Sequence, residues 1–150
     1  MKKIINEPDV FVDEIIEGLL AAHPAWIKSA TADKRALVRK DAPKEGRVGI
    51  VTGGGSGHLP GFLGYVGEGL CSGVAVGNVF SSPSAEQILE ATKAVNGGAG
   101  VLYVYGNYGG DVLNFTDRDP RWWVISARGH VTLCRQDGKD WGKEFPGFDL

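Results

Sequence analysis

Apolar and polar residues alternate along the chain, up to about Phe115, in blocks that predict helices and strands. One set of apolar side chains recurs at helical spacing and predicts an amphipathic helix: Val12, Ile15, Ile16, Leu19 and Leu20. His23, followed by Pro24, suits the end of that helix. Short apolar runs at 48–51, 74–76 and 101–105 predict buried strands.

A second helix is predicted after the strand at 74–76. Ser84 and Gln87 fit a capping box, in which the two side chains satisfy backbone donors at a helix start. An apolar face follows, made of Ile88, Leu89, Ala91 and Val95. Because strands and helices alternate, the predicted fold class is α/β, with a largely parallel or mixed sheet flanked by helices.

The stretch Gly53-Gly54-Gly55-Ser56-Gly57-His58 directly follows the first predicted strand. Glycines accept positive φ angles and let a backbone approach a small ligand, and His58 offers a base or a hydrogen-bonding group. A P-loop needs lysine after its last glycine, while the dinucleotide fingerprint and the nucleophile elbow need glycine where His58 stands. The stretch therefore predicts an active-site loop of another kind, with a tight structural turn as the alternative.

A second cluster repeats this arrangement. The apolar run Val101–Tyr105 leads into Gly106-Asn107-Tyr108-Gly109-Gly110-Asp111. In open α/β sheets, ligands bind beyond the carboxyl ends of the strands. The two loops are therefore predicted to converge on one pocket that His58 and Asp111 face. The alternative for Asp111 is a helix N-cap, and the spacing leaves both open.

Three separated motifs, GGGSGHLPGFLGYVGEG, GNVFSSPSAEQI and GNYGGDVLNF, occur in this order. Together they resemble the dihydroxyacetone kinase family, in its substrate-binding subunit or domain. The resemblance covers Met1 to about Phe115 and implies that residues 1–115 form an incomplete first domain of that subunit. It further implies a phosphotransferase with an alcohol acceptor, whose substrate is a small hydroxyketone phosphorylated on a terminal hydroxyl.

The resemblance also implies roles for individual residues. Gly55, Ser56 and Gly57 match the loop that holds the substrate. His58 matches a histidine that hydrogen-bonds the substrate and is considered a proton acceptor. Asp111 matches an aspartate that contacts the reacting hydroxyl and is also a candidate base. We therefore expect His58 and Asp111 to be catalytic, and all five residues to bind substrate.

Two further positions belong to this candidate site. Ser82 matches a family position near the substrate, and a turn before the next helix is its alternative role. Gly106 stands where many members carry a lysine that contacts the substrate. The smaller residue leads to the hypothesis of a ketone larger than a triose, such as the four-carbon erythrulose, and we count Gly106 among the substrate-binding positions.

The last part of the chain, residues 116–150, matches no part of the family. Members continue with further strands and a second domain whose histidine bonds covalently to the substrate. His130, the only histidine of this tail, lies in the wrong context for that role. Val124-Ile125 and Val131–Leu133 predict short strands. The tail reflects either translation out of frame or genuine divergence, and we expect a truncated subunit with low or no activity.

The composition limits the kinds of binding partner that we expect for this chain. The net charge is −2 and the basic residues are scattered, so there is no reason to expect that the chain binds nucleic acid. The basic pairs at 34–35 and 39–40 suit a solvated face. No long apolar stretch predicts a membrane span or signal peptide, so we expect a cytoplasmic protein. Cys71 and Cys134 lack metal-ligand spacing, and we expect no metal site.

The chain shows no Walker motif and no carboxylate cluster suited to magnesium, although phosphoryl transfer needs a donor and metal ions. We therefore expect no cofactor on this chain. By the resemblance, the donor is ATP, or ADP on a partner subunit, with Mg²⁺, supplied in trans by a helical nucleotide-binding partner subunit or domain. The resemblance also implies a homodimer. The alternative function is a non-catalytic ketone-binding or regulatory module.

Overall fold

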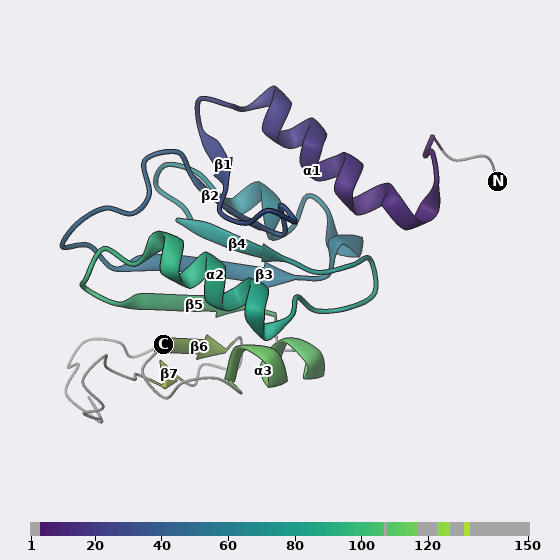
Figure 1. The fold of residues 1–150 in the computed structure, drawn as a ribbon. Helices are drawn as coiled ribbons and strands as arrows, with labels where there is room; N and C mark the ends of the chain where they lie inside the picture. Colours follow the sequence, from purple (N-terminus) through teal and green to yellow (C-terminus); the bar gives the residue numbers. More distant parts are fainter. Residues whose placement is uncertain (1–3, 107, 117–122, 127–130, 133–150) are drawn as a thin grey trace.

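A mixed sheet of seven strands organises the part of the chain that the computed structural model describes, residues 4–106, 108–116, 123–126 and 131–132 (Figure 1). The strands are β1 (Ile27–Ser29), β2 (Ala36–Arg39), β3 (Gly49–Gly54), β4 (Gly73–Val76), β5 (Val101–Tyr105), β6 (Trp123–Ser126) and β7 (Val131–Thr132). The helices are α1 (Phe11–Ala22), α2 (Ala85–Val95) and α3 (Gly109–Thr116), with short 3₁₀ turns η1 (Pro8–Val10), η2 (Ser56–His58) and η3 (Leu63–Tyr65).

The strand order is β1-β2-β4-β3-β5-β6-β7. β4, β3, β5 and β6 pair in parallel, whereas β1, β2 and β7 join antiparallel to their neighbours. The arrowheads of the parallel strands consequently point to one edge of the sheet (Figure 1). The segments that leave β3, β4 and β5 all start at this edge, which is where the sequence predicts the site. The expected α/β class with a mixed sheet is confirmed.

Helices cover both faces of the sheet. Successive residues of a strand point to opposite sides, so neighbouring positions join different cores. Leu37 and Val74 pack in the cluster that contains α1, while Val38 and Ala75 pack in the cluster that contains α2. This sandwich fixes the central strands and therefore the edge from which the candidate loops extend.

Both predicted helices form with the expected faces. The apolar stripe of α1 packs toward the sheet: Val12, Ile15, Ile16, Leu19 and Leu20. In α2, Ser84 Oγ accepts the Gln87 N–H at 3.2 Å and Gln87 Oε1 accepts the Ser84 N–H at 2.9 Å, which confirms the capping box. Leu89 is only partly buried, whereas Thr92 is fully buried because its hydroxyl donates to the Ile88 carbonyl at 2.6 Å.

Of the two basic pairs at β2, the lysines agree with the predicted solvated face, since the Lys34 side chain is 44% exposed and Lys40 is exposed, but the arginines do not. The side chains of Arg35 and Arg39 are only 13% and 15% exposed. Each guanidinium is ion-paired, Arg35 with Asp13 at 2.7 Å and Arg39 with Asp41 at 2.7 Å. These pairs supply the hydrogen bonds that a half-buried cation needs, so a short buried strand forms between two charged positions.

β6 and β7 lie where the sequence predicts short strands, and β6 extends the sheet beside β5. The other expectations for residues 116–150, including the context of His130 and Cys134, fall outside the described residues. Among the described helices, none has the length and apolar character required to cross a membrane.

Candidate functional site

The glycine-rich stretch is divided between strand β3 and the loop that follows it. Gly53 and Gly54 are paired within the sheet, and the loop begins only at Gly55, before the 3₁₀ turn η2. None of the four glycines from 53 to 57 has a positive φ. The prediction that the loop needs glycine for its backbone angles is therefore wrong.

These glycines are required because neighbouring atoms leave no room for a side chain. A Cβ on Gly57 would lie 2.6 Å from the Val79 carbonyl oxygen. A Cβ on Gly53 would lie 2.9 Å from Phe115 Cζ, and one on Gly54 would overlap the Phe62 ring. The sequence pattern thus reports close packing of the protein's own atoms around the loop.

The loop is fixed against the segment that follows β4. The Ser56 N–H donates to the Asn78 carbonyl and the Gly57 N–H to the Val79 carbonyl, both at 3.0 Å, and the Ser56 hydroxyl donates to the Gly77 carbonyl at 2.5 Å. The His58 N–H donates to the Gly55 carbonyl at 3.3 Å. Because these N–H groups are already used, the loop cannot cradle a phosphate with them. What it presents is a fixed, narrow backbone and the His58 side chain.

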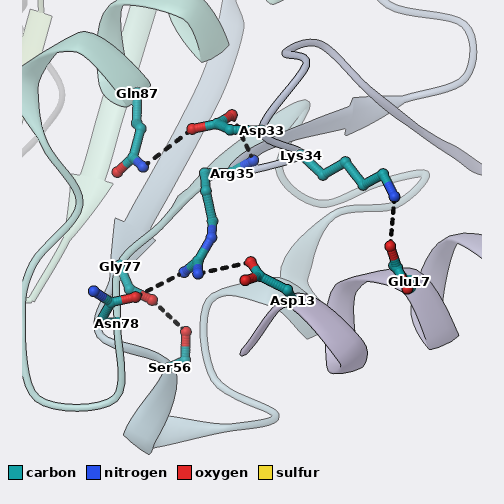
Figure 2. A network of polar contacts seen from close by, with 9 residues as sticks. All are labelled: Asp13, Glu17, Asp33, Lys34, Arg35, Ser56, Gly77, Asn78 and Gln87. Carbon is teal, nitrogen blue, oxygen red and sulfur yellow. Dashed lines mark hydrogen bonds and ion pairs between the residues drawn. The ribbon is translucent and has the colours of Figure 1, made fainter. Parts of the chain in front are cut away.

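A chain of polar contacts connects this loop to α1. Arg35 donates to the Asn78 side chain at 3.0 Å and pairs with Asp13 of α1 at 2.7 Å, and Asn78 is the residue whose carbonyl holds Ser56 (Figure 2). The Arg35 N–H also donates to Asp33 at 3.0 Å. This half-buried arginine therefore connects α1 and the start of β2 to the segment that holds the glycine loop.

His58 lies exposed at the end of the loop, next to Phe62. The two rings meet edge to face with their centroids 6.0 Å apart. Phe62 was not singled out by the sequence analysis. Its ring also fills the space beside Gly54 and lies 3.7 Å from where a Cβ on Gly106 would stand. Phe62 thus extends from the first candidate loop to the second.

Asp111 lies in the first turn of α3, which begins at Gly109, so the N-cap alternative is wrong. The side chain is only 4% exposed. Its Oδ1 atom has no hydrogen-bond partner, and its Oδ2 atom lies 3.3 Å from the point where a Cβ on Gly106 would stand. A buried carboxylate oxygen without a partner is costly, and a ligand hydroxyl is the kind of donor that relieves the cost.

The surroundings of Asp111 are apolar and close-packed. Tyr105, at the end of β5, stacks on Phe115 with ring centroids 4.4 Å apart. Burial raises the pKa of the Tyr105 hydroxyl, and the charge of Asp111 raises that pKa further. The tyrosine hydroxyl therefore keeps its proton.

Ser82 is brought to the same edge. Its Oγ would lie 2.8 Å from a Cβ on Gly110, so the absence of a side chain at Gly110 lets the serine approach α3. Asn114 of α3 donates to the Pro83 carbonyl at 2.8 Å, which fixes this contact. Ser82, on the segment between β4 and α2, therefore lies next to Gly110, the residue that precedes Asp111 in α3.

A groove of about 540 Å³ lies at this edge and is lined by Ser82, Asn78 and Arg35, among others, but by neither His58 nor Asp111. A larger groove of about 800 Å³, lined by residues such as Leu19, Trp26 and Arg39, lies near the amino end of β4 instead, because β2 runs antiparallel to β4. His58, Ser82 and Asp111 therefore lie near the ends of β3, β4 and β5, and neither of these two grooves is lined by all three.

The Dak1 domain matches residues 17–117 of the chain. Over 115 residues the chain is 47% identical to the "PTS-dependent dihydroxyacetone kinase 2, dihydroxyacetone-binding subunit DhaK" of Listeria innocua, covering 77% of this chain and 35% of that protein. It is also 47% identical to the "L-erythrulose kinase" of Pectobacterium atrosepticum, covering 77% of this chain and 19% of that protein. The chain thus spans about a third or less of the length of these relatives.

Solved structures agree with this likeness. The "dihydroxyacetone kinase from C. freundii in complex with AMP-PNP and Mg2+" matches with a TM-score of 0.69 and 36% identity, over 76% of this chain and 22% of that one. The "Dihydroxyacetone kinase operon co-activator Dha-DhaQ" matches with a TM-score of 0.64 and 32% identity, over 69% and 31%. With the motifs, the sheet and the match over residues 17–117 in agreement, the chain belongs to the Dak1 domain family.

Proposed function

We propose that this chain carries the hydroxyketone-binding part of a kinase substrate subunit, within residues 1–115. The observation that supports this most directly is Asp111, a buried carboxylate whose Oδ1 lacks a partner at the carboxyl edge of the sheet. A terminal hydroxyl of a small ketone would donate to Oδ1. When that hydroxyl reacts, Asp111 would accept its proton, which leaves the substrate oxygen as the nucleophile.

His58 would act from the other loop. Its ring is exposed and held beside Phe62, so it can hydrogen-bond a second oxygen of the ketone or serve as the alternative proton acceptor. Gly55, Ser56 and Gly57 would hold this histidine in place through their contacts with the segment after β4. Ser82 would contact the ligand from the third strand exit.

The absence of a side chain at Gly106 supports a range of substrates that includes four-carbon ketones. A side chain at this position would start 3.3 Å from Asp111 Oδ2 and 3.7 Å from Phe62, so any larger residue would extend into the space between them. Glycine leaves that space to the ligand. The similarity to both a dihydroxyacetone-binding subunit and an L-erythrulose kinase is consistent with either chain length.

The phosphoryl donor is proposed to come from a partner. This proposal rests on the family resemblance, and among the described residues no group of three or more His, Cys, Asp or Glu side chains is placed to hold a metal ion. A helical nucleotide-binding subunit or domain would approach the carboxyl edge of the sheet and present the donor to the bound ketone. That donor would be ATP, or an ADP that is re-phosphorylated on the partner.

A second candidate is a ketone-binding regulator without catalysis. It is favoured by the match to an operon co-activator over 69% of the chain. The same residues would then bind the ketone and report its presence to a partner, and proton transfer by Asp111 would have no role. This candidate shares ketone binding with the first and differs only in the reaction.

The test begins with calorimetric titration of the full chain with dihydroxyacetone and with erythrulose. Asp111→Asn and His58→Ala should each weaken binding about tenfold or more, because each removes a hydrogen bond to the ligand. Glu86→Gln, an exposed acidic residue in the first turn of α2, is the matched control and should leave binding unchanged. If neither ketone binds the unchanged chain, the proposal is wrong.

A second assay separates the two candidates. The chain is mixed with ATP, Mg²⁺ and the nucleotide-binding subunit of a dihydroxyacetone kinase, and formation of ketone phosphate is followed. Turnover that Asp111→Asn reduces by about 10²-fold or more supports the kinase. Ketone binding without turnover, in a mixture where a complete kinase works, supports the regulator.

A further inference from the structure

Phe62 adopts a backbone conformation that a bulky residue rarely takes. Its φ is 62° and its ψ is −67°, and the Leu63 N–H donates to the Gly61 carbonyl at 2.8 Å. These values define a γ-turn of the rarer, strained kind, centred on Phe62. A phenylalanine persists in such a turn only where its surroundings hold it, and strain of this kind clusters at ligand sites.

The surroundings that hold Phe62 are those of the candidate site. The ring fills the place where a side chain on Gly54 would stand, at the end of the central strand β3. It also meets the His58 ring edge to face, at 6.0 Å between centroids. The strained turn thus places the aromatic ring on the exit of β3, beside one of the two candidate catalytic residues.

The same ring reaches toward the other candidate catalytic residue. One point, the position of a Cβ on Gly106, lies 3.7 Å from Phe62 Cζ and 3.3 Å from Asp111 Oδ2. The ring tip and the carboxylate therefore border one small space from two sides, and His58 contacts the same ring. A ligand held by Asp111 and His58 would place its carbon chain against the aromatic face.

We infer that Phe62 is a specificity-determining residue that limits the chain length of the ketone. This rests on the proposed function. The ring supplies an apolar wall for the carbon atoms of a triose or tetrose, while the absence of a side chain at Gly106 leaves room between the ring and Asp111. A five-carbon ketose would have to displace the ring, which Gly54 and the strained turn hold in place.

The test compares the affinities of the full chain for dihydroxyacetone, erythrulose and a five-carbon ketose, before and after Phe62→Gly. Glycine keeps the positive φ of the turn and removes only the ring. The affinity ratio of the five-carbon ketose to dihydroxyacetone should rise about tenfold or more. Binding with an unchanged ratio overturns this inference alone, whereas failure of all three ketones to bind the unchanged chain overturns the proposed function with it.

A ligand-free measurement tests the geometry on which the inference stands. Gly54→Ala should lower the melting temperature because its methyl group overlaps the ring, and Phe62→Gly in the same chain should restore most of that loss. Gly64→Ala, whose Cβ would lie 3.5 Å from its nearest neighbour, is the control and should not couple to Phe62. Additive losses for Gly54→Ala and Phe62→Gly would show that the ring does not rest on Gly54, and would overturn the inference.

Discussion

Replacing Asp111 by asparagine removes a buried negative charge and keeps the shape of the side chain. The carboxylate is 4% exposed, and its Oδ1 has no hydrogen-bond partner. If this carboxylate serves to bind a ligand, its missing hydrogen bond lowers the stability of the ligand-free protein. Asp111→Asn should therefore stabilise the ligand-free chain while it weakens ketone binding.

Two terms of opposite sign decide the size of the effect. A buried polar group left without a partner costs about 1–3 kcal/mol, and more when it is charged. Against this, a carboxylate in the first turn of α3 gains about 0.3–1 kcal/mol from the helix dipole. Asparagine keeps a polar group at this position without a partner, so the variant recovers only the part of the cost that the charge adds, and it should gain about 1 kcal/mol of unfolding free energy.

Denaturant unfolding of the full chain measures this gain, with the slope checked to be unchanged. Glu86→Gln removes an exposed charge from the first turn of α2 and should lose a few tenths of a kcal/mol instead. Calorimetry on the same samples should show that Asp111→Asn weakens dihydroxyacetone binding by about 10- to 100-fold, as expected for a hydrogen bond to a charged group. A loss of stability in Asp111→Asn, or unchanged ketone affinity, would refute this reasoning.

Three further predictions concern the surroundings of the site. Arg35→Met should weaken ketone binding several-fold by loosening the glycine loop, with partial rescue by Arg35→Lys; calorimetry beside thermal melting checks this, and unchanged affinity in a folded variant would contradict it. Asp111→Asn should lower the pKa of Tyr105, since the charge of Asp111 raises it, and ultraviolet titration against Tyr105→Phe measures the shift. Hydrogen bonds from Arg39 and Lys44 lower the pKa of Asp41 from 3.8 to about 2, so the stabilisation from these two contacts is present above pH 3.8 and is lost as the pH falls through about 2. Asp41→Asn should therefore weaken the dependence of the melting temperature on pH over that window. An unchanged dependence would count against these ion pairs.

The parts of the fold that the sequence predicts well are those in which one periodicity governs a whole element. The strand at 101–105 is found with the predicted bounds, and the capping box of Ser84 and Gln87 forms as expected. In both cases the local pattern and the tertiary environment agree. β2 is different, because its buried residues lie between arginines whose ion partners, Asp13 and Asp41, cannot be recognised from local sequence.

The candidate site shows the same division. The sequence places His58, Ser82 and Asp111 at strand exits, and the parallel pairing brings those exits to one edge. It misjudges why the glycines are there, since steric contacts with residues distant in the chain, rather than φ angles, exclude a side chain. The sequence analysis missed Phe62 because its position depends on packing against Gly54, and no sequence pattern around Phe62 predicts its strained turn.

The central claim is that a small hydroxyketone binds between the exits of β3 and β5. Amide NMR of the full chain, titrated with dihydroxyacetone, tests it most directly. The account predicts that signals of Ser56, Gly57, His58, Phe62 and Asp111 shift together with one affinity, and that Asp111→Asn weakens that affinity. Absence of saturable shifts, or shifts confined to the groove beside Trp26, would contradict the account.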